Sequence, residues 1–84
     1  MYKTKDFYLA VTFMTLGYFL RDVEAVPNQK YVMFVFEDEN EELPALADEF
    51  WAGNLTVNPL DFMHNNKELK SRLHFALERV KNGT

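Results

Sequence analysis

The strongest hydrophobic pattern of the chain lies in residues 7–20, where polar interruptions are few. Residues 7–16 predict a helix that is apolar on nearly every side, with Thr4 as its N-cap, Asp6 in its first turn and Gly17 just after its end. A surface helix of a small domain needs only one apolar stripe. This helix must therefore be covered on more than one side, either by the rest of the fold or by a second copy of the chain.

A β-hairpin is predicted after this helix. Residues 18–26 are rich in aromatic and β-branched side chains, residues 27–29 have the turn sequence Pro-Asn-Gln, and residues 31–36 are all apolar. A half-exposed strand would alternate apolar and polar side chains. We therefore expect the second strand to lie centrally in the sheet with packing on each side. Residues 2–4 are a candidate short strand beside it, and residues 55–57 are a candidate fourth strand.

A middle helix is predicted where the composition changes to the acidic segment of residues 37–42. Acidic side chains in a first turn meet the positive end of the helix dipole, and Pro44 is tolerated in the same turn. Apolar residues then recur at helical spacing from Leu43 to Phe50, and Gly53 follows as a stop signal.

The C-terminal helical region begins with Asn58 as N-cap and Pro59 at the first helical position. Its apolar stripe consists of Phe62, Leu69, Leu73, Ala76 and Val80, with Leu77 beside it. A continuous helix over residues 59–81 would be ~34 Å long, more than the ~30 Å diameter expected of a domain this size. Asn65 and Asn66, which favour caps over helix interiors, mark a candidate break, and the sequence leaves a continuous helix open.

These elements predict a single α+β domain over residues 1–84, with a small antiparallel sheet around a central hairpin. An N-terminal helix, a middle helix and the C-terminal helical region pack on the sheet. The 84 residues are 48% hydrophobic and include no cysteine, which removes disulfides, thiolate nucleophiles and cysteine-based metal sites. The net charge of −4 is too small for an acidic mimic and has the wrong sign for a general nucleic-acid binder.

The apolar block of residues 7–20 also raises the alternative of a membrane or secretory segment. Two lysines precede it, and residues 23–25 have the character of a signal-peptidase site. However, Asp6 lies in the region that should be positive, two threonines and Gly17 interrupt the block, and a span needs ~20 apolar residues. We therefore expect a cytoplasmic protein that does not bind membranes.

Five short segments carry a resemblance to a known family. They are YKTKDFYLA at residues 2–10, FVFED at 34–38, FWAGNL at 50–55, VNP at 57–59 and LKSR at 69–72. In this order and spacing, the chain resembles an uncharacterised family of short bacterial and phage proteins. The resemblance implies a small cytoplasmic protein, often encoded by phage or mobile elements, and carries over no activity and no catalytic residue.

Catalytic chemistry has little support in the sequence. The three glycines lie far apart, so no glycine-rich loop can hold a phosphate. Ser71, His74 and Glu78 have the order of a nucleophile, a base and an orienting acid on one helical face. A regular helix, however, offers no free backbone N–H groups beside the serine to stabilise an oxyanion. We predict no catalytic site.

A metal site is equally weakly indicated. Asp61, His64 and Glu68 lie on one helical face, but three ligands fall short of the four of a structural zinc site. The pattern also offers no hydrogen-bond partners that would hold the ligands in place. We predict that the chain is not an enzyme and binds no metal or cofactor.

The candidate interaction surface lies on the last helical region, outside the apolar stripe. Its basic stripe consists of Lys67, Lys70, His74 and Lys81, and its aromatic flank consists of Arg72, Phe75 and Arg79. A basic stripe can follow phosphates, and a phenylalanine between arginines can stack on a base or fill a partner's pocket. Three simpler alternatives are that the cations complement the helix C-terminus, that Glu68 pairs with Arg72 at i, i+4, and that the N-terminal segment covers Phe75.

The sequence therefore predicts a non-enzymatic module that binds another protein, a host or phage factor, and that forms a homodimer. The basis is that the apolar content exceeds what one small core can bury. The alternative is a nucleic-acid-binding protein that uses the basic face of the last helix. Exposure of the basic stripe would favour that alternative, and pairing of the stripe with the acidic segment of residues 37–42 would count against it.

Overall fold

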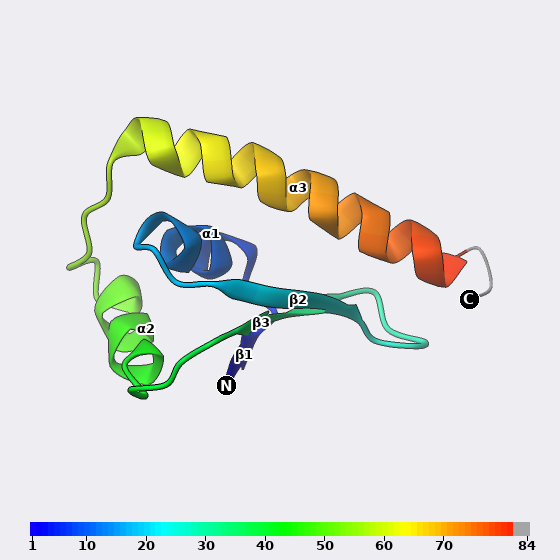
Figure 1. Cartoon of the computed structure of the whole chain (residues 1–84), viewed down its shortest axis with the longest axis horizontal. Coiled ribbons are helices and arrows are strands. Elements are labelled where there is room, and N and C mark those ends of the chain that lie inside the picture. The colour runs from blue at the N-terminus through cyan, green and yellow to red at the C-terminus, as the bar shows by residue number, and fades with distance from the viewer. Residues whose placement is uncertain (82–84) are drawn as a thin grey trace.

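The computed structural model describes residues 1–81, and it describes side chains up to residue 79. Its elements, in chain order, are β1 (Tyr2–Thr4), α1 (Phe7–Thr15), β2 (Leu20–Ala25), β3 (Val32–Phe36), α2 (Leu43–Trp51) and α3 (Pro59–Lys81) (Figure 1). The three strands form one antiparallel sheet in the order β1-β3-β2. The predicted α+β class, the hairpin and the short N-terminal strand are confirmed.

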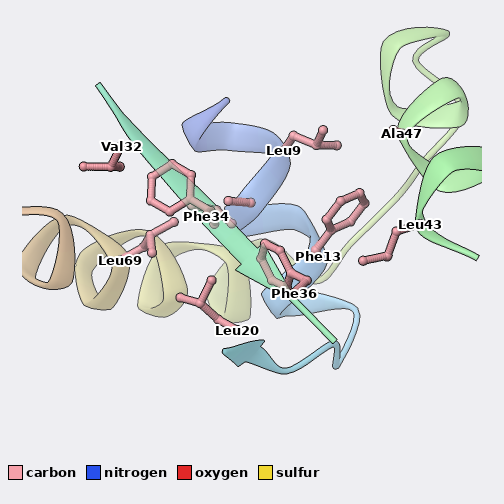
Figure 2. Close-up of a cluster of buried hydrophobic side chains, with 11 residues drawn as sticks. Leu9, Phe13, Leu20, Val32, Phe34, Phe36, Leu43, Ala47 and Leu69 are labelled. Carbon is pink, nitrogen blue, oxygen red and sulfur yellow. The ribbon is translucent and has the colours of Figure 1, made fainter. Parts of the chain in front are cut away.

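Helices α1 and α3 lie on the same face of the sheet, and α2 lies at one end of the molecule (Figure 1). Helix α3 contacts both α1 and β2. Figure 2 shows the core, in which side chains from both long strands and all three helices meet. Its largest members include Phe13, Phe34, Phe36 and Leu69, each at most 1% exposed. The rings of Phe13 and Phe36 pack edge to face, with centroids 5.4 Å apart.

Helix α1 is covered by the rest of the same chain, which is the first of the two alternatives given above; a second copy of the chain is not needed to cover it. Five consecutive residues, from Leu9 to Phe13, are buried. The N-cap is Asp6 and not Thr4, because Thr4 is paired with Phe34 in the sheet. The Asp6 carboxylate accepts the Leu9 N–H at 2.8 Å, and the Thr4 hydroxyl supports this turn by accepting the Asp6 N–H at 3.1 Å.

Both helix ends marked by glycine are confirmed. Gly17 has φ +98°, and its N–H donates to Met14 while the next N–H, of Tyr18, donates to Phe13. Gly53 has φ +78° and closes α2 with the same pattern of hydrogen bonds. This is the Schellman arrangement, which needs a left-handed residue that glycine adopts without a steric penalty.

Strand β3 is central, as predicted, but only one face of it is covered by helices. Phe34 and Phe36 point into the core, whereas Val35 lies on the opposite face, which we call the open face, and is still only 2% exposed. On the open face, Lys3 of β1 and Glu24 of β2 meet across β3, with Nζ and Oε1 3.3 Å apart. This ion pair spans β3 on the open face, beside Val35.

Helix α2 begins after the acidic segment and not within it. No acidic residue lies in its first turn, and its N-cap, Glu42, makes no side-chain capping bond. The Asp38 carboxylate instead accepts the N–H groups of Glu42 and Leu43, at 2.9 and 3.2 Å. Glu41, at φ +53°, lies in a left-handed conformation just before the helix, so the acidic segment ends where α2 begins.

Residues 55–57 form no strand; they belong to the connection from α2 to α3. Figure 1 shows this connection at the end of the molecule, beside α2 and away from the three strands. A strand needs the edge of another strand to pair with. Residues 55–57 do not lie beside either edge strand of the sheet, β1 or β2, and so do not pair.

Helix α3 is continuous through Asn65 and Asn66, so the candidate break is wrong. The molecule is elongated, with extents of 40, 26 and 21 Å, and the helix fits along its long axis, which a spherical estimate could not anticipate. Asn65 has a different role, because its Nδ2 donates to the Thr15 hydroxyl of α1 at 3.2 Å. The predicted N-cap is confirmed, since the Asn58 side chain accepts the N–H groups of Leu60 and Asp61.

Candidate interaction surface on α3

Helix α3 turns its predicted apolar stripe toward α1 and β2. Leu69 and Ala76 are buried, Phe62 and Leu73 are half-buried, and Leu77 is 38% exposed at the margin. The side chain of Val80, also placed in this stripe, lies outside the described residues. The rotation of the helix is therefore fixed, and both predicted flanks face outward.

The basic stripe faces solvent over the part that the structure describes. Lys67, Lys70 and His74 are exposed, and the side chain of Lys81 lies outside the described residues. Within residues 1–79, the ion pairs join Lys3 to Glu24 and Arg21 to Glu37, so the acidic segment does not neutralise the stripe. Exposure of the stripe is expected to favour the nucleic-acid alternative, and the three described residues of the stripe are exposed.

Apolar side chains are exposed beside the basic stripe, near the start of α3. Leu60 and Met63 are 59% and 56% exposed. A hollow of about 310 Å³ lies here, lined by Phe62, Met63, Asn66, Lys67 and Lys70. Along this side of the helix, exposed apolar side chains in the first turns are therefore followed toward the C-terminus by the exposed lysines.

The aromatic flank is on the opposite side of α3 and is also exposed. The Phe75 ring is 63% exposed, so the N-terminal segment does not cover it, and the Arg79 guanidinium carbon lies 6.0 Å from its centroid. Arg72, one turn earlier, is half-buried. Cation and ring thus form one compact unit at the helix surface.

A groove separates this flank from the sheet, and we call it the β2–α3 groove. Its volume is about 280 Å³, and it is lined by Asp22 and Val23 of β2 and by Ser71, Arg72, Phe75, Ala76 and Arg79 of α3. The sequence identified the helical side of the groove from the position of Phe75 outside the stripe. It gave no signal for Asp22 and Val23, because only the tertiary fold brings β2 beside this part of α3.

The acidic segment borders a wide hollow at the other end of the molecule. This hollow, of about 710 Å³, is lined by Met1, Tyr2, Glu37, Asp38, Glu39, Glu41 and Pro44. Burial, with smaller contributions from the charges of Asp48 and Asp38, raises the pKa of Tyr2 above its ordinary 10.0. The Tyr18 hydroxyl donates to the Glu42 carboxylate, and this bond raises the pKa of Tyr18. Two residues of the acidic segment therefore have structural roles. The Asp38 carboxylate accepts backbone N–H groups at the start of α2, and the Glu42 carboxylate accepts the Tyr18 hydroxyl.

The residues considered for catalysis remain on regular helix. Ser71, His74 and Glu78 all lie within α3, where the backbone N–H groups belong to the helical ladder, and Ser71 alone of the three lines the β2–α3 groove. Within residues 1–79, no three His, Asp or Glu side chains gather closely enough to hold a metal ion, and Asp61, His64 and Glu68 form no such group. In the same part of the chain, no helix has the length and apolar character to cross a bilayer.

The chain belongs to the family described as a domain of unknown function, DUF5659, whose model matches residues 1–75. The resemblance to an uncharacterised family is thereby confirmed. No curated protein and no solved structure matches the chain. The matched region ends at Phe75, so it contains the β2 side of the groove and most of its helical side, and Arg79 and Lys81 lie beyond it.

Proposed function

We propose that the chain is a small non-enzymatic protein-binding module whose partner contacts the aromatic flank of α3 and the β2–α3 groove. The observation that carries this proposal is the exposed ring of Phe75, placed between Arg72 and Arg79 at the wall of a groove. Interface hot spots are enriched in aromatic and arginine side chains that fill or line such pockets. Burial of this ring by a partner would remove a large apolar surface from water.

The cellular setting is part of the proposal. We place the module in the cytoplasm of bacterial cells, with a host or phage protein as its partner. The basis for this setting is the sequence resemblance described above.

Self-association is a further part of the proposal. The sequence suggests it from the apolar helix α1, but the structure supports it better from exposed apolar residues of α3. Helix α1 is covered within one chain, so it requires no second copy. Leu60 and Met63 on the outer side of α3 remain exposed, and they could pack against the same residues of a second chain related by a twofold axis. We therefore expect a homodimer that uses the start of α3 and leaves the β2–α3 groove free.

The test compares two exposed phenylalanines. Phe75 and Phe19 are 63% and 67% exposed, so Phe75→Ala and Phe19→Ala remove similar surface, but only Phe75 lies in the groove. In affinity purification from the native cell with nuclease added, we expect the same protein to be recovered with the wild type and Phe19→Ala and to be lost with Phe75→Ala. Equal recovery with both variants would contradict the proposal, and so would a partner that disappears when nuclease is added. Circular dichroism of both variants checks that the fold is retained.

Nucleic-acid binding is the second candidate function, and the exposure of Lys67, Lys70 and His74 favours it. Contacts from such a stripe to phosphates would give an affinity that falls with salt. The overall charge of −4 opposes this association at long range. We therefore rank it below protein binding, and salt-dependent binding measurements separate the two.

A further inference from the structure

We propose that the β2–α3 groove accepts an extended segment of the partner protein, which adds to the outer edge of β2 as a fourth strand. The inference rests on the proposed protein-binding function and specifies the form in which the partner binds. It depends on three features: a free strand edge, a helix that overhangs it, and the charges on the open face.

The outer edge of β2 is available for pairing. In the order β1-β3-β2, strand β2 pairs with β3 on one side, and no strand within residues 1–81 pairs with it on the other. The Val23 N–H donates to the Asp22 carboxylate at 2.8 Å, so this amide faces the outer edge and not β3. Backbone groups of alternate residues in an antiparallel strand point the same way, and Ala25 therefore presents its N–H and C=O to the same edge.

Helix α3 forms the wall above this edge. It contacts β2 and lies over it in Figure 1. Phe75 and Ala76 of α3 line the groove together with Val23 of β2. A peptide that extends a sheet beneath an adjacent helix or pocket is a recurrent mode of recognition, in which the backbone supplies affinity and alternate side chains supply specificity. An added strand would lie ~4.8 Å outside β2, with every second side chain directed toward Phe75.

The charges on the open face define the other side chains of the segment. Asp22 and Glu24 both lie on this face, opposite Val35 and Met33 of β3. Glu24 is paired with Lys3, whereas the Asp22 carboxylate forms no ion pair among residues 1–79 and bonds only to the Val23 N–H. Opposite charges on directly facing strand residues are stabilising. The segment that fits best therefore alternates apolar residues, which face α3, with lysine or arginine, which face Asp22.

A second copy of the chain does not fit this edge. Residues that face each other across an antiparallel pair lie on the same face of the sheet. If β2 of one chain paired with β2 of another about a twofold axis through Asp22, Val23 or Glu24, Asp22 would face itself or Glu24, or Glu24 would face itself. Like charges in these positions are destabilising. An axis through Ala25 would set Val23 opposite Pro27, which has no N–H to donate. The occupant is therefore a segment of a different protein.

The experiment uses four synthetic peptides and amide-resolved NMR of the full chain. The first is acetyl-Lys-Val-Lys-Val-Lys-Val-Lys-amide, and the second has glutamate at every lysine position. The other two are the lysine peptide with N-methyl groups either on all the valines or on all the lysines. Because N–H groups of alternate residues point to opposite edges of a strand, N-methylation blocks pairing with β2 in only one of the last two.

We expect the lysine peptide to slow hydrogen exchange of the Val23 and Ala25 amides by about tenfold or more at saturation, since new strand hydrogen bonds protect them. One N-methylated peptide should retain this effect and the other should lose it. The glutamate peptide should bind about two- to fivefold more weakly than the lysine peptide. In the variant Asp22→Lys this order of preference should reverse.

The phenylalanine pair serves again as a matched control. Phe75→Ala should weaken the lysine peptide about tenfold, the effect of losing part of one aromatic contact, and Phe19→Ala should leave it unchanged. If the peptides shift groove signals without slowing exchange at Val23 and Ala25, or if both N-methylated peptides bind equally well, strand addition is wrong and the protein-binding proposal stands. If none of the peptides binds the groove, strand addition is also wrong. Failure of the protein-binding proposal itself would appear separately, as equal partner recovery with Phe75→Ala and Phe19→Ala.

Discussion

Replacement of Phe34 by alanine should remove a large fraction of the molecule's unfolding free energy. Phe34 occupies the central strand, is 1% exposed, and pairs with Thr4 on one side and Val23 on the other. Its ring also packs at 70° against that of Phe7, with centroids 6.2 Å apart. The substitution therefore removes a side chain from the core cluster that also contains Leu9 of α1 and Leu69 of α3 (Figure 2).

The size of the effect follows from burial and chain length. Truncation of a buried phenylalanine to alanine costs about 3–5 kcal/mol. A chain of this length has a total unfolding free energy of roughly 4–13 kcal/mol, so the loss is a large fraction of the whole. At about 4–8 °C per kcal/mol for a small domain, we expect the melting temperature to fall by roughly 12–40 °C.

Thermal and urea unfolding followed by circular dichroism measure this change, with Phe19→Ala as the control. Phe19 is 67% exposed, and its truncation should alter the unfolding free energy by no more than about 0.5 kcal/mol. A melting temperature for Phe34→Ala within a few degrees of the control would refute the placement of β3 at the centre of the core.

Four further outcomes follow from the structure. Gly17→Ala should cost about 1–2 kcal/mol in denaturant unfolding, because φ is +98° there, and no loss would contradict the Schellman end of α1. Asn58→Ala should cost about 1 kcal/mol through two lost capping bonds, and an unchanged midpoint would contradict that role. Sedimentation equilibrium at micromolar concentration should give a dimer mass, and a monomer mass would end the self-association proposal. Fluorescence anisotropy at physiological salt should show nucleic-acid binding with a dissociation constant no tighter than ~10⁻⁴ M. The protein-binding proposal would be overturned by sub-micromolar binding that disappears when Lys67, Lys70 and Lys81 are replaced by glutamate while the fold stays intact.

Local chemistry accounts for the elements that the sequence predicted well. The glycines at the ends of α1 and α2 and the Asn58 cap act through hydrogen bonds within a few residues, so a short stretch of sequence determines them. The uninterrupted apolar run of residues 31–36 likewise favours a buried strand, and residues 32–36 of it form β3. These features do not depend on how distant segments meet.

The errors arose where distant segments compete for the same residues. Thr4 is a good N-cap by composition, yet pairing of β1 with β3 places it in a strand and moves the cap to Asp6. The asparagine pair favours a break by propensity, yet Asn65 bonds to Thr15 of α1 and the helix continues. Tertiary contacts outweigh propensities of a few tenths of a kcal/mol to about 1 kcal/mol, and a single sequence does not display those contacts.

The two halves of α3 have different neighbours, and this difference connects the fold to the proposed function. The first half is fixed by Asn65 against α1 and by Leu69, which is fully buried in the core. The second half extends past α1 over the hairpin (Figure 1), where it has β2 beneath it. Beside this half of the helix, α3 and β2 border the β2–α3 groove. Stability thus resides mainly in the first half and the proposed binding surface in the second, which is why Phe75 can be changed to test binding without removing a core residue.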